Sequence, residues 1–270
     1  MSAWQEVGRR VVDAMAAWPE VDAVALGGSH AAGAGDEGSD VDLYVYGAAP
    51  PSLERRRALA AGSPHLEIDN RFFEPGDEWI DPSSGLHVDV MYRTPGWIQE
   101  ELDRVLVRCE AGVGYSTCFW DNVRAAQPVF DRRGWYAVLR ARADVPYPEA
   151  LRAAVVAKNR PLLDTNLSSF AEQLEKAVAR GDRVSANHRA AAFLASYFDV
   201  LFALNRATHP GEKRLLDYVA RRCPVRPTSL EADVTRLVEA SGRGVADAGT
   251  AARALAEGLD PLLRAEGLVG

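Results

Sequence analysis

Apolar and polar positions along the first half of the chain predict a β-sheet flanked by helices. Apolar residues recur at helical spacing over 2–18, which predicts an amphipathic N-terminal helix. Short apolar or alternating runs predict strands at 22–27, 41–46, 67–73, 86–92 and near 127–131. Helices are predicted directly after Ser29, over 53–61, over 96–108 and after residue 134. Because prolines and glycines crowd the interval 74–85, that interval is predicted to be a loop.

The pattern changes near Val145-Pro146, where strand signals stop and the chain becomes rich in alanine and leucine. Helical periodicity then predicts helices at 149–160, 166–180, 185–206, 213–222, 228–240 and 246–266. A chain of 270 residues is long enough for two domains. We therefore expect an α/β (α+β) protein, with a mixed-sheet catalytic domain at 1–145 and an all-α helical bundle at 146–270.

Three aspartates on predicted strands are the strongest chemical signal. Asp40 and Asp42 stand two residues apart in an alternating strand, so their side chains project from the same face. Asp89 lies in a second alternating stretch, in which Val88 and Val90 point the other way. Carboxylates that converge on adjacent strands repel one another unless a cation lies between them, and Mg²⁺ prefers such oxygen ligands.

A glycine-serine turn precedes these aspartates. The buried strand at 22–27 runs into Gly27-Gly28-Ser29, where a helix is expected to begin. The free backbone N–H groups of such a turn, together with the Ser29 hydroxyl, favour binding of a phosphate group. A phosphate site beside metal-binding carboxylates predicts chemistry on a nucleoside triphosphate.

Gly28-Ser29, ten intervening residues and Asp40-Val41-Asp42 together resemble the nucleotidyltransferase superfamily that includes DNA polymerase β. More closely, this segment resembles the small bacterial adenylyltransferases that act on aminoglycoside and lincosamide antibiotics. This resemblance covers roughly the first half of the chain. It implies two Mg²⁺ ions and transfer of a nucleoside monophosphate from ATP or another NTP to an acceptor, with release of pyrophosphate.

The resemblance also implies roles for individual residues. Gly28 and Ser29 match the pair that holds the phosphates, and Ser39 occupies a position where the family often has a hydroxyl near the triphosphate. The three metal ligands correspond to Asp40, Asp42 and Asp89. In related two-domain enzymes a lysine of the helical domain reaches the triphosphate, and Lys213 matches it. The general base is left open between Asp89 and Glu67.

The composition limits the classes of binding partner and the cellular setting that we expect for this protein. A net charge of −7 argues against broad nucleic-acid binding, which needs a basic surface, and it suits a cationic acceptor. Three scattered cysteines form no metal-binding or disulfide pattern, which is typical of a reduced, cytoplasmic protein. No apolar run of membrane-spanning length is present in the sequence.

The sequence thus predicts adenylyl transfer from ATP to a hydroxyl of a small molecule, either an antibiotic or a metabolite. One alternative is a protein-modifying enzyme like the antitoxin-type nucleotidyltransferases, although these usually consist of the catalytic domain alone. Another is a non-catalytic nucleotide-binding protein, which would be expected to have lost one of the carboxylates. The choice of nucleotide, the acceptor and the oligomeric state are left open by the sequence.

Overall fold

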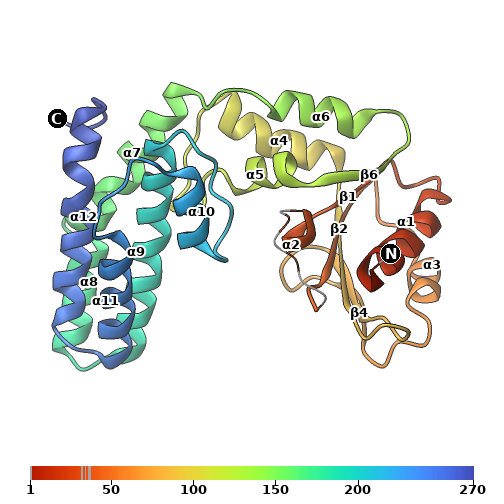
Figure 1. Ribbon diagram of the computed structural model, residues 1–270, viewed down its shortest axis with the longest axis horizontal. Helices are drawn as coiled ribbons and strands as arrows, with labels where there is room; N and C mark the ends of the chain where they lie inside the picture. The colour runs from red at the N-terminus through yellow and green to blue at the C-terminus, as the bar shows by residue number, and fades with distance from the viewer. Residues whose placement is uncertain (1, 32, 34, 36–37) are drawn as a thin grey trace. The chain divides into compact units, whose positions relative to one another are not determined.

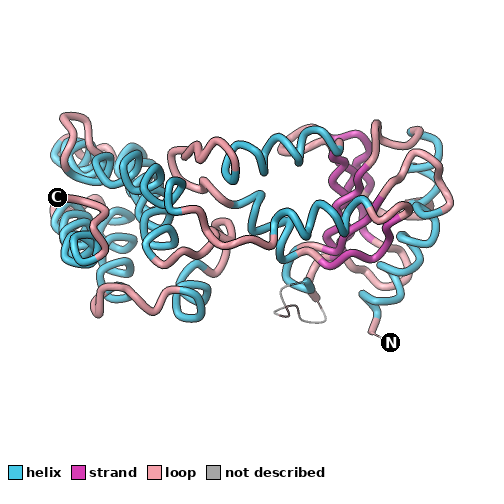
Figure 2. Tube along the Cα trace, turned by 90° about the horizontal axis from the view of Figure 1, so that it is seen from above, coloured by secondary structure: helices cyan, strands magenta, loops and turns pink. Residues whose placement is uncertain are grey.

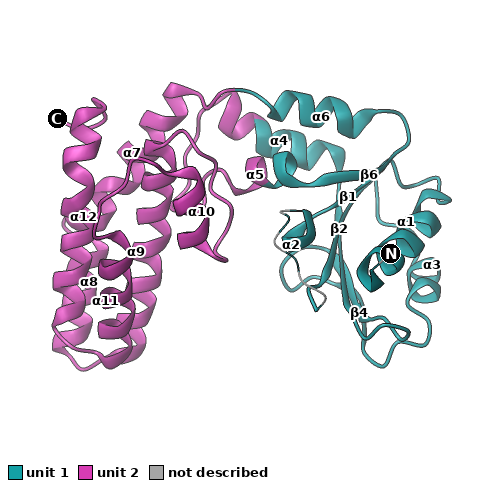
Figure 3. Cartoon of the chain, in the orientation of Figure 1, with its two compact units in different colours: residues 1–102, 122–145 teal, residues 103–121, 146–270 magenta. Residues whose placement is uncertain are grey.

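The protein is described by a computed structural model that covers residues 2–31, 33, 35 and 38–270. The contacts divide the chain into two compact units (Figure 3). The first unit comprises Met1–Leu102 and Asn122–Val145, and the second comprises Asp103–Asp121 and Pro146–Gly270. The strands among the described residues, drawn in magenta in Figure 2, all belong to the first unit.

The first unit is built on a six-stranded mixed sheet (Figure 1). Its strands are β1 (Ala23–Leu26), β2 (Val41–Tyr46), β3 (Leu66–Asn70), β4 (Gly76–Ile80), β5 (His87–Arg93) and β6 (Gln127–Asp131). They lie in the order β3-β4-β5-β2-β1-β6. The pair β2 and β5 is parallel, whereas the other neighbouring strands pair antiparallel. This arrangement confirms the predicted α/β class with a mixed sheet.

One face of the sheet forms the hydrophobic core of the first unit. Helix α1 (Ala3–Ala16) buries an apolar stripe of Val7, Val11 and Met15 against this face. The strands contribute alternate residues to the same core, among them Val41, Leu43, Val45, Val88 and Val90. Because side chains alternate along a strand, Asp42 and Asp89 project from the opposite face. The remaining helices in this part of the chain are α2 (Gly28–Ala31), α3 (Leu53–Leu59), α4 (Pro95–Leu106), α5 (Cys118–Ala125) and α6 (Trp135–Ala143).

Strand β4 corrects the sequence prediction, which treated residues 74–85 as a loop. Gly76 begins the strand, and its backbone lies so close to β5 that an added Cβ would stand 2.7 Å from the Val90 carbonyl oxygen. Asp77 occupies a buried position, where sequence patterns lead one to expect an apolar residue. The glycine allows close packing against the neighbouring strand, and the aspartate takes part in a buried hydrogen-bond network. Neither residue fits the apolar pattern of a buried strand, so hydrophobic patterning does not predict β4.

The second unit is a bundle of helices. Its main helices are α7 (Glu149–Asp164), α8 (Phe170–Ala179), α9 (Arg183–Leu204), α10 (Leu215–Arg222), α11 (Leu230–Arg243) and α12 (Asp247–Ala265). They correspond to the six helices predicted from periodicity, with ends that shift by a few residues. Helix α9 is central and packs against α7, α8, α11 and α12. Its C-terminal part is therefore buried on every side, from Ser196 to Leu204.

Residues 103–121 belong to the second unit, although they precede the predicted domain boundary at 145. Polar contacts attach this segment to the bundle. The Ser116 backbone N–H and hydroxyl donate hydrogen bonds to the Asp199 carboxylate at 3.0 and 2.6 Å, and the Gly114 N–H donates to Asn159 Oδ1 at 2.9 Å. The division by contacts thus differs from the limits 1–145 and 146–270, and those domain limits stay a prediction.

None of the helices that the structure describes combines the length and the apolarity needed to cross a membrane.

Asp81, which follows β4, is expected to make the stability of the fold depend on pH in the acid range. Its carboxylate is fully buried and accepts hydrogen bonds from Ser83, Ser84 and Arg10. Burial raises the pKa of Asp81, but these hydrogen bonds outweigh it and lower the pKa to about 2. A carboxyl group whose pKa is lower in the folded state stabilises the fold above its unfolded pKa, and that stabilisation is lost as the pH falls through the folded value.

We therefore expect Asp81 to contribute about 2 kcal/mol of stability that disappears between about pH 4 and about pH 2. Urea unfolding measured across this range checks the prediction. Asp81→Asn should show a correspondingly smaller loss of unfolding free energy over the same range. An acid dependence identical to that of the wild type would contradict the assignment to Asp81.

Candidate active site

Asp42 and Asp89 lie side by side on the face of the sheet opposite the core. They are register partners on the parallel strands β2 and β5. Both side chains are partly buried, whereas their strand neighbours Val41, Val88 and Val90 are fully buried on the other face. The structure therefore brings together two of the three aspartates that the sequence singles out.

Asp40 lies just before β2 and is more exposed, with 53% of its side chain accessible. Its Oδ1 atom lies 3.6 Å from Nδ1 of His87, at the start of β5. The other ring nitrogen of His87, Nε2, lies 3.3 Å from a carboxylate oxygen of Glu78 on β4. His87 thus stands between the first predicted metal ligand and an acidic residue of a neighbouring strand.

Glu78 is a site residue that sequence reasoning missed. It is the register partner of Asp89 on one side and of Glu67 on the other. Asp42, Asp89, Glu78 and Glu67 therefore form a row of carboxylates across four adjacent strands. Glu78 was overlooked because β4 was predicted to be a loop, and Trp79-Ile80 was the one β-favouring signal in it.

The negative charge of this row shows in the pKa of Asp89. Burial is the largest cause that raises it, and the nearby carboxylates of Glu78, Asp42 and Glu74 raise it further. His87 lowers it, and the net result is a pKa of about 6. The ionised form of Asp89 is thus disfavoured by its surroundings, and a cation beside it would relieve that cost.

The oxygen donors fit a hard divalent cation such as Mg²⁺ in chemical type. Asp42 and Asp89 present carboxylates from adjacent strands, and Asp40 lies at the entrance to the same strand. Over residues 2–31, 33, 35 and 38–270, no group of three His, Cys, Asp or Glu side chains is gathered closely enough to form a complete metal site.

The glycine turn lies directly against Asp42. The Gly27 N–H donates a hydrogen bond to the Asp42 carbonyl oxygen at 2.9 Å. Gly28 has a φ of +59°, and an added Cβ would stand 1.7 Å from Asp42 Oδ2. Only a residue without a side chain can therefore approach the carboxylate so closely. Ser29 follows, partly buried, within the short helix α2.

Ser39 is held near this turn through its backbone. Its carbonyl oxygen lies 3.1 Å from His30 Nε2, and the His30 ring stacks on Trp4 with centroids 4.1 Å apart. His30 thus fastens the segment before Asp40 to α2 and α1. The role of the Ser39 hydroxyl near a triphosphate stays a prediction.

Glu67 and Lys213 are two further residues that the sequence predicts to act in the reaction. Glu67 is exposed on the edge strand β3, at the far end of the carboxylate row. Lys213 belongs to the second unit, where it is exposed in the turn that precedes α10. Their proposed roles as base and phosphate ligand stay predictions.

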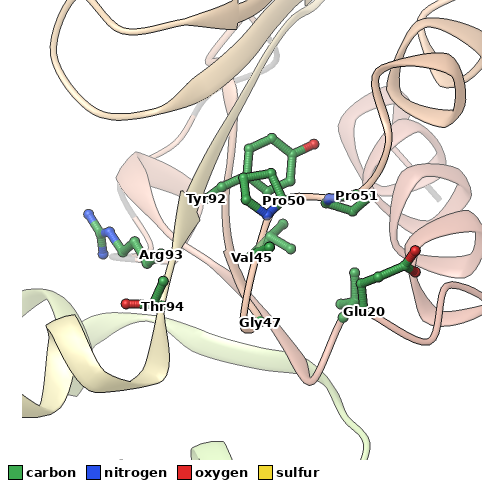
Figure 4. A pocket seen from close by; sticks show the side chains of 10 residues that line it. Glu20, Val45, Gly47, Pro50, Pro51, Tyr92, Arg93 and Thr94 are labelled. Atoms are coloured by element: carbon green, nitrogen blue, oxygen red, sulfur yellow. The ribbon is translucent and has the colours of Figure 1, made fainter.

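A small cavity at the other end of β2 and β5 is distinct from the aspartate cluster (Figure 4). It lies where these strands end, between Val45, Gly47, Pro50, Tyr92 and Thr94. Its volume of about 20 Å³ has room for about one water molecule. It is therefore too small to accept a nucleotide or an acceptor.

A match to a family model agrees with the motifs. Residues 9–110 match the family model described as a nucleotidyltransferase domain, and residues 122–215 match a domain of unknown function, DUF4037. Among solved structures, the chain is similar to a nucleotidyltransferase-like protein from Exiguobacterium sibiricum 255-15. The two share 14% identity with a TM-score of 0.41, over 97% of this chain and 79% of that one. No curated protein matches the chain.

The first of these matches spans the glycine-serine turn and all three aspartates. The chain therefore carries a nucleotidyltransferase domain over residues 9–110, fits the nucleotidyltransferase superfamily and is an enzyme of the transferase class.

Proposed function

We propose that this enzyme transfers AMP from ATP to a hydroxyl group of a small molecule in an Mg²⁺-dependent reaction. The observation that carries the proposal is the register pair of Asp42 and Asp89, with the Gly28 backbone packed against the Asp42 carboxylate. Paired carboxylates beside a turn that is open to a phosphate suit transfer at phosphorus, where positioning and electrostatics provide most of the catalysis.

In the proposed reaction the acceptor oxygen forms a bond to the α-phosphorus of ATP. The bond from that phosphorus to the bridging oxygen breaks, pyrophosphate leaves with the electron pair, and the acceptor hydroxyl loses its proton. Bound Mg²⁺, expected as two ions, would neutralise the phosphates and lower the pKa of the attacking hydroxyl. Asp40, Asp42 and Asp89 would hold the metal, while Gly28 and Ser29 would bind the phosphates. Asp89 or Glu67 would take the proton.

The carboxylate row supports a positively charged acceptor. Beyond Asp89, the row continues through Glu78 to Glu67 towards the sheet edge. A surface of one charge attracts ligands of the opposite charge and orients them. An amine-bearing compound such as an aminoglycoside-like antibiotic fits this requirement, and a cationic metabolite fits it equally well. We accordingly propose a small molecule, rather than a nucleic acid or a membrane, as the partner of this site.

Pyrophosphate release tests the proposal. The wild-type protein would be incubated with Mg²⁺ and each of ATP, GTP, CTP and UTP, with a panel of aminoglycosides, lincosamides and cell extract as acceptors. Asp42→Asn serves as the blank. Release that requires one purified acceptor, and that vanishes in the blank, would support the proposal and identify the substrate.

Other outcomes of this assay would favour one of the alternative functions. Release with extract alone calls for the mass of the modified species, which separates a metabolite from a protein target. A labelled protein would favour the protein-modifying alternative. Tight ATP binding without pyrophosphate release in any mixture would favour a non-catalytic nucleotide-binding protein.

Lys213 offers a separate test of nucleotide binding. If its ammonium group contacts the triphosphate, Lys213→Ala should raise the KM for ATP by about tenfold, since a charge-assisted hydrogen bond contributes roughly 1.5–3 kcal/mol. Lys176→Ala is the matched control, because Lys176 is an exposed lysine that pairs with Glu172 on α8. Equal KM values for the two variants would remove Lys213 from the site.

A further inference from the structure

Tyr44 lies two residues beyond Asp42 on β2 and projects from the same face of the sheet. It is 7% exposed, so its ring is almost completely enclosed. Asn122 Nδ2 donates a hydrogen bond to the Tyr44 hydroxyl oxygen at 2.6 Å, and the Arg93 guanidinium lies over the ring, 4.0 Å from its centroid. The ring is thus held at its edge and on its face.

Arg93 and Asn122, which contact Tyr44, are fixed by hydrogen bonds of their own. Arg93 donates two hydrogen bonds to the Glu74 carboxylate, both at 2.8 Å, and a third to Asn122 Oδ1 at 2.6 Å. The Arg93 side chain is 3% exposed. A bidentate pair of an arginine with a carboxylate has a defined geometry, and its loss would leave a buried charge unpaired. Arg93 and Asn122 therefore keep the Tyr44 ring in one orientation.

The far edge of that ring packs against the glycine turn. An added Cβ on Gly27 would lie 2.4 Å from Cε2 and 2.6 Å from Cζ of Tyr44. These are the outer ring atoms, which are absent from a shorter side chain. Because the ring cannot move aside, the Gly27 backbone must follow the ring surface. Gly27 in turn donates its N–H to the Asp42 carbonyl, and Gly28 touches the Asp42 carboxylate.

We propose that Tyr44 is a positioning residue, which fixes the Gly27–Gly28 turn against Asp42 and thereby sets the geometry of the nucleotide and metal site. The inference rests on the proposed function, because it assumes that this turn and Asp42 serve MgATP. Tyr44 would act through the turn and not on the reacting atoms. Its effect is to remove alternative positions of the turn, so that less ordering is needed when the ligand binds.

A comparison of Gly27→Ala in three backgrounds tests the proposal. In the wild type the new methyl group would collide with the Tyr44 ring and displace the turn. Tyr44→Phe keeps the colliding ring atoms and loses the hydroxyl, whereas Tyr44→Leu lacks the outer ring atoms. Affinity for MgATP would be measured by isothermal titration calorimetry, and thermal melting followed by circular dichroism would show that each variant is folded.

We expect Gly27→Ala to weaken MgATP binding about tenfold in the wild type and in Tyr44→Phe, but less than about threefold in Tyr44→Leu. A general loss of stability would not produce this difference between Phe and Leu. If Tyr44→Leu does not fold, Tyr44→Met replaces it, since methionine also lacks the ring.

An equal effect of Gly27→Ala in the Phe and Leu backgrounds would overturn the positioning role, while the proposed function would stand. Absence of MgATP binding in the folded wild type would instead overturn the proposed function, and the positioning role with it. The two failures are therefore distinguishable in one set of titrations.

Discussion

Asp42→Asn is expected to lower the rate of nucleotidyl transfer by on the order of a thousandfold or more. Asp42 stands at the centre of the site, paired in register with Asp89 and in contact with the Gly28 backbone. An asparagine keeps the shape of the side chain but removes the charge that would hold the metal. We expect ATP still to bind weakly through the glycine-serine turn, so the loss should appear mainly in kcat.

The other two aspartates should differ from each other in a measurable way. Asp40→Asn is expected to abolish transfer in the same manner as Asp42→Asn. Asp89→Asn should reduce kcat strongly with a smaller effect on nucleotide affinity, because its proposed metal ion serves the attacking hydroxyl. Steady-state kinetics and MgATP titration separate these effects. Asp13→Asn, an exposed carboxylate of α1, provides the control that should leave both quantities unchanged.

Turnover at the wild-type level in any of the three active-site variants would contradict the assignment of these residues to two metal ions. The melting temperature of each variant would show whether it is folded, so that a loss of activity caused by unfolding can be recognised. Asparagine differs little from aspartate in volume, so we expect the three variants to remain folded.

Asp77→Ala is expected to destabilise the catalytic unit by about 3–5 kcal/mol. The Asp77 carboxylate accepts hydrogen bonds from Arg56 at 2.7 Å, from the Tyr92 hydroxyl at 2.8 Å and from the Asp69 N–H at 2.8 Å. The side chains of Arg56 and Asp77 are 4% and 2% exposed. Removal of the carboxylate would leave a buried guanidinium whose remaining partners are the partly exposed Asp69 carboxylate and the face of the Tyr92 ring.

The destabilisation expected for Asp77→Ala arises mainly because the buried Arg56 guanidinium would lose its partner, and less because the Arg56–Asp77 ion pair is itself strongly stabilising. Burial raises the pKa of Asp77, against the lowering effect of its hydrogen bonds and of Arg56. The pair therefore loses much of its Coulombic gain to desolvation, and breaking it is more costly than its formation is favourable.

Neighbouring residues of α3 supply a matched control. Arg55 pairs with Glu20 at 2.8 Å, but these two side chains are 43% and 39% exposed. Glu20→Ala should therefore change the free energy of unfolding by less than about 1 kcal/mol. Urea unfolding of both variants gives the comparison directly. Equal values for Glu20→Ala and Asp77→Ala would show that burial does not determine the cost.

Much of the secondary structure could be predicted because it depends on local periodicity. The strand at 41–46 agrees with β2 at both ends, since Val41, Leu43 and Val45 alternate without interruption. The same alternation placed Asp42 on the face opposite the core. The helices of the second half followed from their apolar spacing, and the nucleotidyltransferase domain followed from Gly28, Ser29 and the aspartates.

Strand β4 and Glu78 could not be predicted in this way. The strand begins with a glycine and carries a buried aspartate, so its pattern is not that of an apolar core strand. What stabilises it is pairing with β3 and β5 and the contact of Asp77 with Arg56, which is 21 residues away in sequence. None of these partners is visible in a local window of the chain.

The sequence by itself determined that Gly28, Ser29 and the three aspartates are the candidates for the chemistry, because residue type and strand alternation are local properties. Only the tertiary structure decided how those residues meet. The register of β2 against β5 places Asp42 beside Asp89, and the ring of Tyr44 sets how closely Gly27 approaches. Strand register and side-chain packing depend on contacts between distant segments, which form only when the whole sheet assembles.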